Sequence, residues 1–181
     1  MTKNKSIDRW FIWGIVFICL LGTLLHFTFD LFNHSTFIGL FSPVNESVWE
    51  HLKIIFYPTI IWFFILYFKL ESDFRRIIIS STISISVSCF ILLSIYYIYT
   101  GSTGKESVIV DIVAYLLGTT LGQYLALSAY LKLETKNIYF YVSLLFLFAF
   151  LISLIYFTFN PPHIPLFFDK SSNQYGLISR K

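Results

Sequence analysis

Phe41-Ser-Pro-Val-Asn-Glu-Ser-Val-Trp-Glu-His51 opens a strongly apolar segment of this 181-residue sequence. The stretch places Asn45, Glu46, Glu50 and His51 where a protein with no polar task would have leucines. Ionisable groups at a membrane boundary are costly, so they usually mark a functional site. The stretch therefore predicts both a membrane boundary and a polar site beside it.

The composition outside this stretch is that of an integral membrane protein. The chain is 56% hydrophobic, 20% aromatic and 13% charged, with a mean hydropathy of +0.72, which is more apolar than a soluble domain requires. A net charge of +3 with dispersed cations does not indicate nucleic acid as a partner. Cys19 and Cys89 both fall in expected spans, so neither a disulfide framework nor a thiolate metal site is supported.

Five apolar runs of about 20 residues predict five transmembrane helices. They are expected at residues 10–29, 49–68, 77–99, 107–131 and 138–159. At about 1.5 Å per residue, each run is long enough to cross a hydrocarbon core of about 30 Å. We therefore predict an all-α fold, a single transmembrane domain of residues 1–181, with the tail 160–181 packing on the outer face. The Ile, Lys, Asn and Phe bias is typical of AT-rich bacterial genomes, so a multi-pass protein of the bacterial plasma membrane is expected.

Positive charges predict the orientation of this bundle. The N-terminus and the turns after spans two and four hold most of the loop cations: Lys3, Lys5, Arg9, Lys69, Arg75, Arg76, Lys132 and Lys136. The other two loops hold Lys105 alone. The positive-inside rule then places the N-terminus in the cytoplasm and the C-terminus outside.

This orientation brings acids and imidazoles from separate segments to the outer end of the bundle. They are His26, Asp30, Glu46, Glu50, His51, Asp111, His163 and Asp169. His26 and Asp30 are four residues apart, which places them on one helix face, and Glu46 and Glu50 repeat that spacing. The sequence thus predicts a polar site assembled from several spans.

Histidine and carboxylate without thiolate form the ligand set of a catalytic zinc or similar divalent ion. We expect His26, His51 and His163 as ligands, with Asp30 as a fourth ligand or as a partner that orients an imidazole. In an alternative arrangement Asp111 is the ligand and Asp30 orients the ring. Spacing alone does not choose between the two.

Glu50 is expected to be the general base of this site, with Glu46 and Asp111 as further catalytic carboxylates. A structural role competes with this hypothesis, because carboxylates near a helix N-terminus are stabilised by its dipole. In that alternative the polar groups pair with one another and with the backbone to fix loops on the bundle. Lys53 is expected either to neutralise Glu46 or Glu50, or to extend outward.

Three segments together resemble a family of small bacterial multi-span membrane proteins of unknown function. They are His26-Phe-Thr-Phe-Asp30, the stretch Phe41 to Lys53, and Asn160-Pro-Pro-His-Ile-Pro-Leu-Phe-Phe-Asp169. The resemblance implies the multi-span topology and no reaction. A looser analogy links the clustered His and Asp to the membrane hydrolases that include alkaline ceramidases, although those have seven spans.

These observations predict a metal-dependent membrane hydrolase or transferase. Because a site at the outer headgroup level meets headgroups first, we expect a lipid or lipid-linked substrate at the outer leaflet. The alternative is a non-enzymatic membrane protein: a permease component, a sensor or an immunity-type binding protein.

Overall fold

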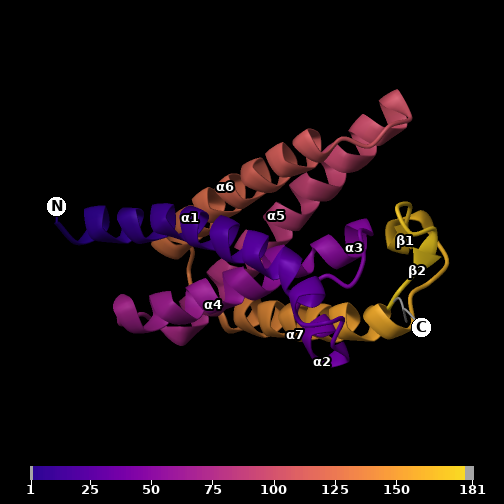
Figure 1. Cartoon of the computed structure of the whole chain (residues 1–181). Coiled ribbons are helices and arrows are strands. Elements are labelled where there is room, and N and C mark those ends of the chain that lie inside the picture. The colour runs from indigo at the N-terminus through magenta and orange to yellow at the C-terminus, as the bar shows by residue number, and fades with distance from the viewer. Residues whose placement is uncertain (1, 178–181) are drawn as a thin grey trace.

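The computed structural model describes residues 2–177, with side chains from Ser6 onward. The side chains of Lys3 and Lys5, and the last four residues of the expected tail domain, lie outside that part. The elements are α1 (Thr2–Leu31), α2 (Thr36–Gly39), α3 (Val48–His51), α4 (Lys53–Lys69), α5 (Phe74–Thr103), α6 (Val108–Lys132), α7 (Asn137–Phe159), a 3₁₀ turn (Pro165–Phe167), β1 (Phe168–Asp169) and β2 (Gln174–Tyr175). They form the expected all-α bundle (Figure 1).

Five helical segments among the described residues are long and apolar enough to cross a membrane, which confirms the five predicted spans. They are Ser6–Leu31, Val48–Lys69, Phe74–Thr103, Val108–Lys132 and Asn137–Phe159. The third runs several residues beyond its predicted ends at both sides. It begins early because the Asp73 side chain caps it by accepting from the Arg75 amide, and it ends at Gly104 in the left-handed conformation. Which end of the bundle faces the cytoplasm stays a prediction.

The closest helix pair is α5 and α6. A Cβ atom on Gly118 would lie 2.8 Å from the Ser88 carbonyl oxygen, and one on Gly122 would lie 2.6 Å from that of Ser84. Only glycine fits at such a backbone approach, which is a common device between membrane helices. The Ser88 hydroxyl lies 3.1 Å from the Gly118 carbonyl and bridges the two helices.

A tyrosine of α6 contacts the carbonyl in α4 that a proline leaves without its helical hydrogen bond. Pro58 has no amide hydrogen, so the Ile54 carbonyl one turn earlier lacks its helical partner. The Tyr115 hydroxyl lies 3.3 Å from that carbonyl and 2.8 Å from the Ile18 carbonyl of α1. One side chain thus connects α1, α4 and α6 near the end where the polar stretch lies.

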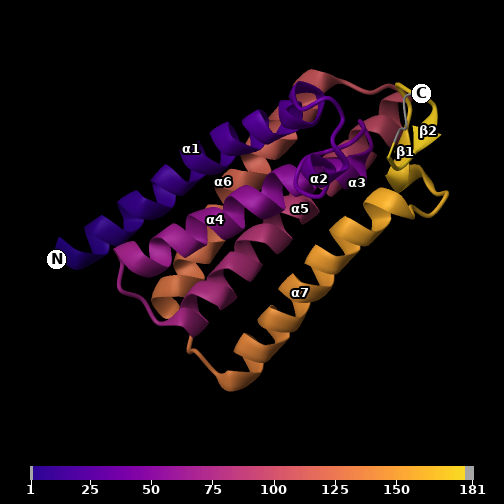
Figure 2. The same cartoon turned by 60° about the horizontal axis from the view of Figure 1, so that its bottom comes forward.

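The C-terminal tail folds back on that same end of the bundle. Figures 1 and 2 both show the β1–β2 hairpin beside α3, with the N-terminus at the opposite end. The Phe167 ring lies 4.9 Å from the Trp49 ring of α3, and the Asn45 side chain donates to the Gly176 carbonyl at 2.8 Å. The tail and the α2–α3 loop therefore form one surface.

Candidate metal centre

The local fold of the stretch 41–53 separates its acidic residues. Ser47 caps α3 by accepting from the Glu50 amide at 3.4 Å, and the Asn45 side chain accepts from the Ser47 amide at 2.9 Å. Glu46 therefore precedes the helix, whereas Glu50 and His51 lie on it. The prediction that Glu46 and Glu50 share a helix face is wrong, because the helix begins after Glu46.

Glu46 instead meets two histidines, one on α1 and one on α3. Its two carboxylate oxygens lie 3.9 Å from His26 Nε2 and 3.4 Å from His51 Nε2, and the two imidazole centres are 5.1 Å apart. Among the described residues this is the one group of three His, Cys, Asp or Glu side chains whose ligand atoms all lie within 4.8 Å of one another. We call it the His-Glu-His cluster.

His51 is oriented by the backbone of its own helix. Its Nδ1 lies 2.8 Å from the Ser47 carbonyl oxygen, which can only accept, so Nδ1 carries the hydrogen and Nε2 faces Glu46. A carbonyl acceptor behind an imidazole is the usual arrangement around metal-ligating histidines. Hydrogen bonding to His51 holds the pKa of Glu46 below its usual value, so this carboxylate is charged at neutral pH.

The His-Glu-His cluster has nearly the dimensions of a metal site. Zinc ligands at about 2.0–2.1 Å from the ion in tetrahedral geometry lie about 3.3 Å from one another. The contact between Glu46 and His51 at 3.4 Å is close to this value, and the one to His26 at 3.9 Å requires a small inward movement. His26 Nδ1 is buried and has no hydrogen-bond partner among the described residues. The donor set therefore fits a divalent ion. His51 is the ligand whose ring is already oriented by a hydrogen bond, the one to the Ser47 carbonyl.

A cavity of about 200 Å³ lies beside the cluster, bounded by His26 and Glu46. At about 30 Å³ per water molecule, it has room for several waters or a small headgroup. Asp169 of the tail is part of its wall and accepts from the amides and hydroxyls of Ser171 and Ser172. Burial raises the pKa of Asp169, but these hydrogen bonds outweigh it and hold that pKa below its usual value. The sequence did not single out the two serines, because isolated tail serines carry no recognisable pattern.

The other predicted ligands lie around the cluster rather than in it. Asp30 pairs with His34 at 3.0 Å on the wall of the same cavity. The sequence around His34 is typical of a surface loop and gives no indication of this pairing. Asp111 of α6 lies within electrostatic range of His51. His163 is exposed and stacks on Tyr175 with the ring centres 4.6 Å apart. The structure thus groups two of the three expected histidines with Glu46 in place of the third.

Sequence comparison relates the whole described chain to one family. Residues 1–177 match the family of unknown function DUF6512. The chain belongs to this family. The expected resemblance to a family of unknown function is therefore confirmed. No curated protein and no solved structure matches the chain.

A second charged group in this DUF6512 chain lies behind the cluster, and it is fully paired. Glu50 and Lys53 are 1% and 0% exposed, and their charged atoms are 2.7 Å apart. The Lys53 ammonium also donates to the Gly39 and Ser42 carbonyls at 2.7 and 3.2 Å. Glu50 accepts from the Val44 amide at 3.0 Å and lies 3.1 Å from the Thr158 hydroxyl.

We call these two residues the Glu50–Lys53 pair. It joins the α2–α3 loop to α4 and α7, which is the structural role that the sequence left open. Lys53 is thus the counter-charge of Glu50. This geometry gives no support to Glu50 as a general base, because both of its carboxylate oxygens are already engaged inside the bundle.

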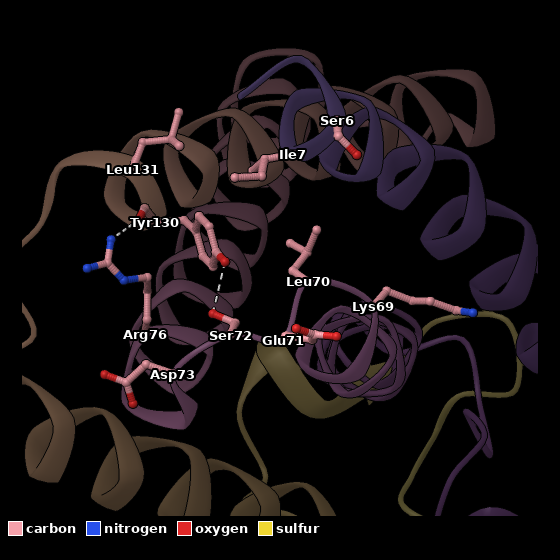
Figure 3. A pocket seen from close by; sticks show the side chains of 10 residues that line it. All are labelled: Ser6, Ile7, Lys69, Leu70, Glu71, Ser72, Asp73, Arg76, Tyr130 and Leu131. Carbon is pink, nitrogen blue, oxygen red and sulfur yellow. Dashed lines mark hydrogen bonds between the residues drawn. The ribbon is translucent and has the colours of Figure 1, made fainter. Parts of the chain in front are cut away.

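A larger cavity of about 530 Å³ lies at the opposite end of this DUF6512 chain, where α4 ends and α5 begins. Figure 3 shows Tyr130 pointing into it and donating to Ser72, with Arg76 bonded to the Tyr130 carbonyl. Its wall mixes Lys69 and Arg76 with Glu71 and Asp73. None of its residues belongs to the His-Glu-His cluster, so the candidate chemistry lies at the other end.

Proposed function

We propose that this protein is a metal-dependent membrane hydrolase or transferase, with Zn²⁺ or a similar divalent ion held by His26, Glu46 and His51. One observation carries the proposal: three side chains from two helices and a loop converge within 4.8 Å beside a cavity of about 200 Å³. Three protein ligands with an open position are typical of catalytic rather than structural zinc.

The bound ion would supply an activated water and polarise the group under attack. The chain's own residues would do the rest. Glu46 would bind the ion through its carboxylate, and the hydrogen bond from His51 Nδ1 to the Ser47 carbonyl would leave Nε2 free to bind it as well. The Asp30–His34 pair on the cavity wall takes the place of Glu50 as proton acceptor. Asp111 lies within electrostatic range of His51 and would add negative charge beside the ion.

The position of the cavity supports a membrane-borne substrate. The cavity lies at the end of α1 and at the beginning of the span that contains α3 and α4, so it would sit at the level of lipid headgroups. In the orientation predicted from the loop cations, that level is the outer leaflet. A lipid or lipid-linked substrate would reach the site without leaving the bilayer.

A permease component is the second candidate, and a different group of residues favours it. Buried polar side chains run along α5 and α6 through the middle of the bundle: Ser80, Ser84, Ser88, Thr119 and Gln123. Ser80 Oγ, Thr119 Oγ1 and Gln123 Oε1 have no hydrogen-bond partner among the described residues. Unsatisfied polar groups at membrane depth are expected where water or a solute enters.

Metal analysis of the purified protein tests the first proposal. The protein is expressed with an affinity tag that contains no histidine, and its metal is measured by mass spectrometry after gel filtration in detergent. We expect one zinc per chain in the natural protein and in His163→Ala, and loss of zinc in His51→Ala. His163→Ala is the matched control because that ring stacks on Tyr175 of the tail and is not part of the His-Glu-His cluster. Absence of zinc from the natural protein after zinc loading, or equal zinc in both variants, would contradict the proposal.

A further inference from the structure

We infer that the cavity beside the His-Glu-His cluster takes an amphiphile whose headgroup is uncharged or carries an amine, and excludes phosphate headgroups. The inference rests on the proposed metal site and names its substrate class. Three features of the described residues carry it: the charges on the cavity wall, the pairing of the nearest lysines and the apolar rim.

The cavity wall is acidic. It contains the carboxylates of Asp30, Glu46 and Asp169, and none of the described residues that line it is a lysine or arginine. With neutral imidazoles, these three carboxylates and one divalent ion would together leave one negative charge at the site.

The two lysines nearest in sequence to these acids form ion pairs with other carboxylates. Lys53 is buried and bound to Glu50. Lys170, which follows Asp169, pairs with Glu106 at 2.9 Å and so connects the tail to the loop before α6. Lys53 is therefore not available to neutralise an incoming phosphate, and Lys170 already lies against a carboxylate. Recognition of phosphate normally uses arginine or lysine donors, and a like charge in a partly desolvated cavity is strongly disfavoured.

The rim of the cavity is apolar. Phe29 and Val44 are buried at its wall. Phe27, whose ring centre lies 5.1 Å from that of His26, is 53% exposed. An exposed apolar patch beside a polar cavity at headgroup level suits a molecule with a hydrocarbon chain and a polar head. The acids would then contact the head while the chain lies along α1.

Binding of matched metal-binding amphiphiles tests the inference. Zinc-loaded protein in maltoside detergent is titrated with dodecyl hydroxamic acid, which is uncharged at neutral pH, with an amine-bearing hydroxamate of equal chain length, and with dodecylphosphonic acid. We expect both hydroxamates to bind at least about tenfold more tightly than the phosphonate, because the phosphonate brings up to two negative charges to the acidic wall and a zinc-bound hydroxamate brings one. In Asp30→Asn the difference should shrink, whereas the exposed acid Glu134, mutated to Gln, serves as a control with no effect.

The outcomes separate this inference from the proposed function. Zinc binding accompanied by equal or tighter phosphonate binding, or by no binding of any of the three amphiphiles, overturns the headgroup class and leaves the metal site intact. Failure of the natural protein to hold zinc overturns the metal site itself. A hydroxamate preference that is unchanged in Asp30→Asn would show that wall charge is not its cause.

Discussion

The His-Glu-His cluster and the Glu50–Lys53 pair come from the same short stretch and use similar side chains, yet they differ in burial and in partners. The Glu46 side chain is 56% exposed and meets two imidazoles at 3.4 and 3.9 Å. The Glu50 side chain is 2% exposed and contacts an ammonium at 2.7 Å. One glutamate has unused acceptor capacity toward a cavity, whereas the other has its oxygens engaged inside the bundle.

This difference shows that residue type alone does not identify a catalytic carboxylate. A buried acid with a full set of donors stabilises the fold and has nothing left for a substrate. A half-exposed acid between two imidazoles contributes little to stability and remains free to bind an ion. The predictions below test this division of roles, beginning with the largest effect.

Removing Lys53 should destabilise the protein most. In Lys53→Met the Glu50 carboxylate would remain buried without its counter-charge, which costs about 3–5 kcal/mol in such pairs. Thermal unfolding in detergent should show a large decrease in midpoint. The double variant Glu50→Gln with Lys53→Met should recover most of the loss, since it leaves no buried charge.

Lys136→Met is the matched control for that substitution. Lys136 pairs with Glu134 at 3.2 Å, but both side chains are more than half exposed, so its loss should change the unfolding free energy very little. Equal midpoints for Lys53→Met and Lys136→Met would refute a stabilising role for the buried pair.

Removing the neutral partner of Glu50 should have a moderate effect. The Thr158 hydroxyl is shared between Glu50 at 3.1 Å and the Leu154 carbonyl of its own helix at 2.8 Å. Thr158→Val removes it, and a buried acceptor that loses a donor costs about 1–3 kcal/mol. Thr120→Val is its control, because that exposed hydroxyl donates only to the Leu116 carbonyl of its own helix. Denaturant unfolding of both variants measures the difference, and a larger loss in Thr120→Val would be inconsistent with this account.

Acidification should have the smallest effect on stability. The pKa of Glu46 is below its ordinary value of 4.5 in the folded state. The ionised Glu46 therefore contributes its full stabilisation above the ordinary pKa of 4.5. That stabilisation is lost as the pH falls through the lower pKa of the folded state. Unfolding midpoints measured between neutral and strongly acidic pH should decrease slightly more for the natural protein than for Glu46→Gln. Parallel curves would show that the contact between Glu46 and His51 contributes nothing.

The positions of the spans could be predicted from the sequence because each span is a long apolar run, and its average hydropathy stays high even where it contains a few polar residues. The predicted span 77–99 is shorter than α5 because charged residues in the first turn of the helix and polar residues in its last turn are typical of loops. Helix continuation there depends on the Asp73 cap and on Gly104, which are local features that a hydropathy window does not detect.

The site was less predictable because its residues are brought together by loop geometry. Glu50 and His51 are neighbours in sequence, but adjacent helix positions point about 100° apart, so one faces inward and the other faces Glu46. His163 follows a span at the correct end, yet a stack on Tyr175 holds its ring on the tail. Pairing of Asp30 with His34 depends on a turn in which Asn33 and His34 adopt positive φ, which spacing rules do not anticipate.

Zinc content of two glutamate variants tests the central claim most directly. Glu46→Gln removes the exposed carboxylate, and Glu50→Gln with Lys53→Met removes the buried charges without leaving either unpaired. The account predicts one zinc per chain in the natural protein and in the double variant, and an affinity at least about tenfold lower in Glu46→Gln. Full zinc binding by Glu46→Gln, or its selective loss from the folded double variant, would contradict the account.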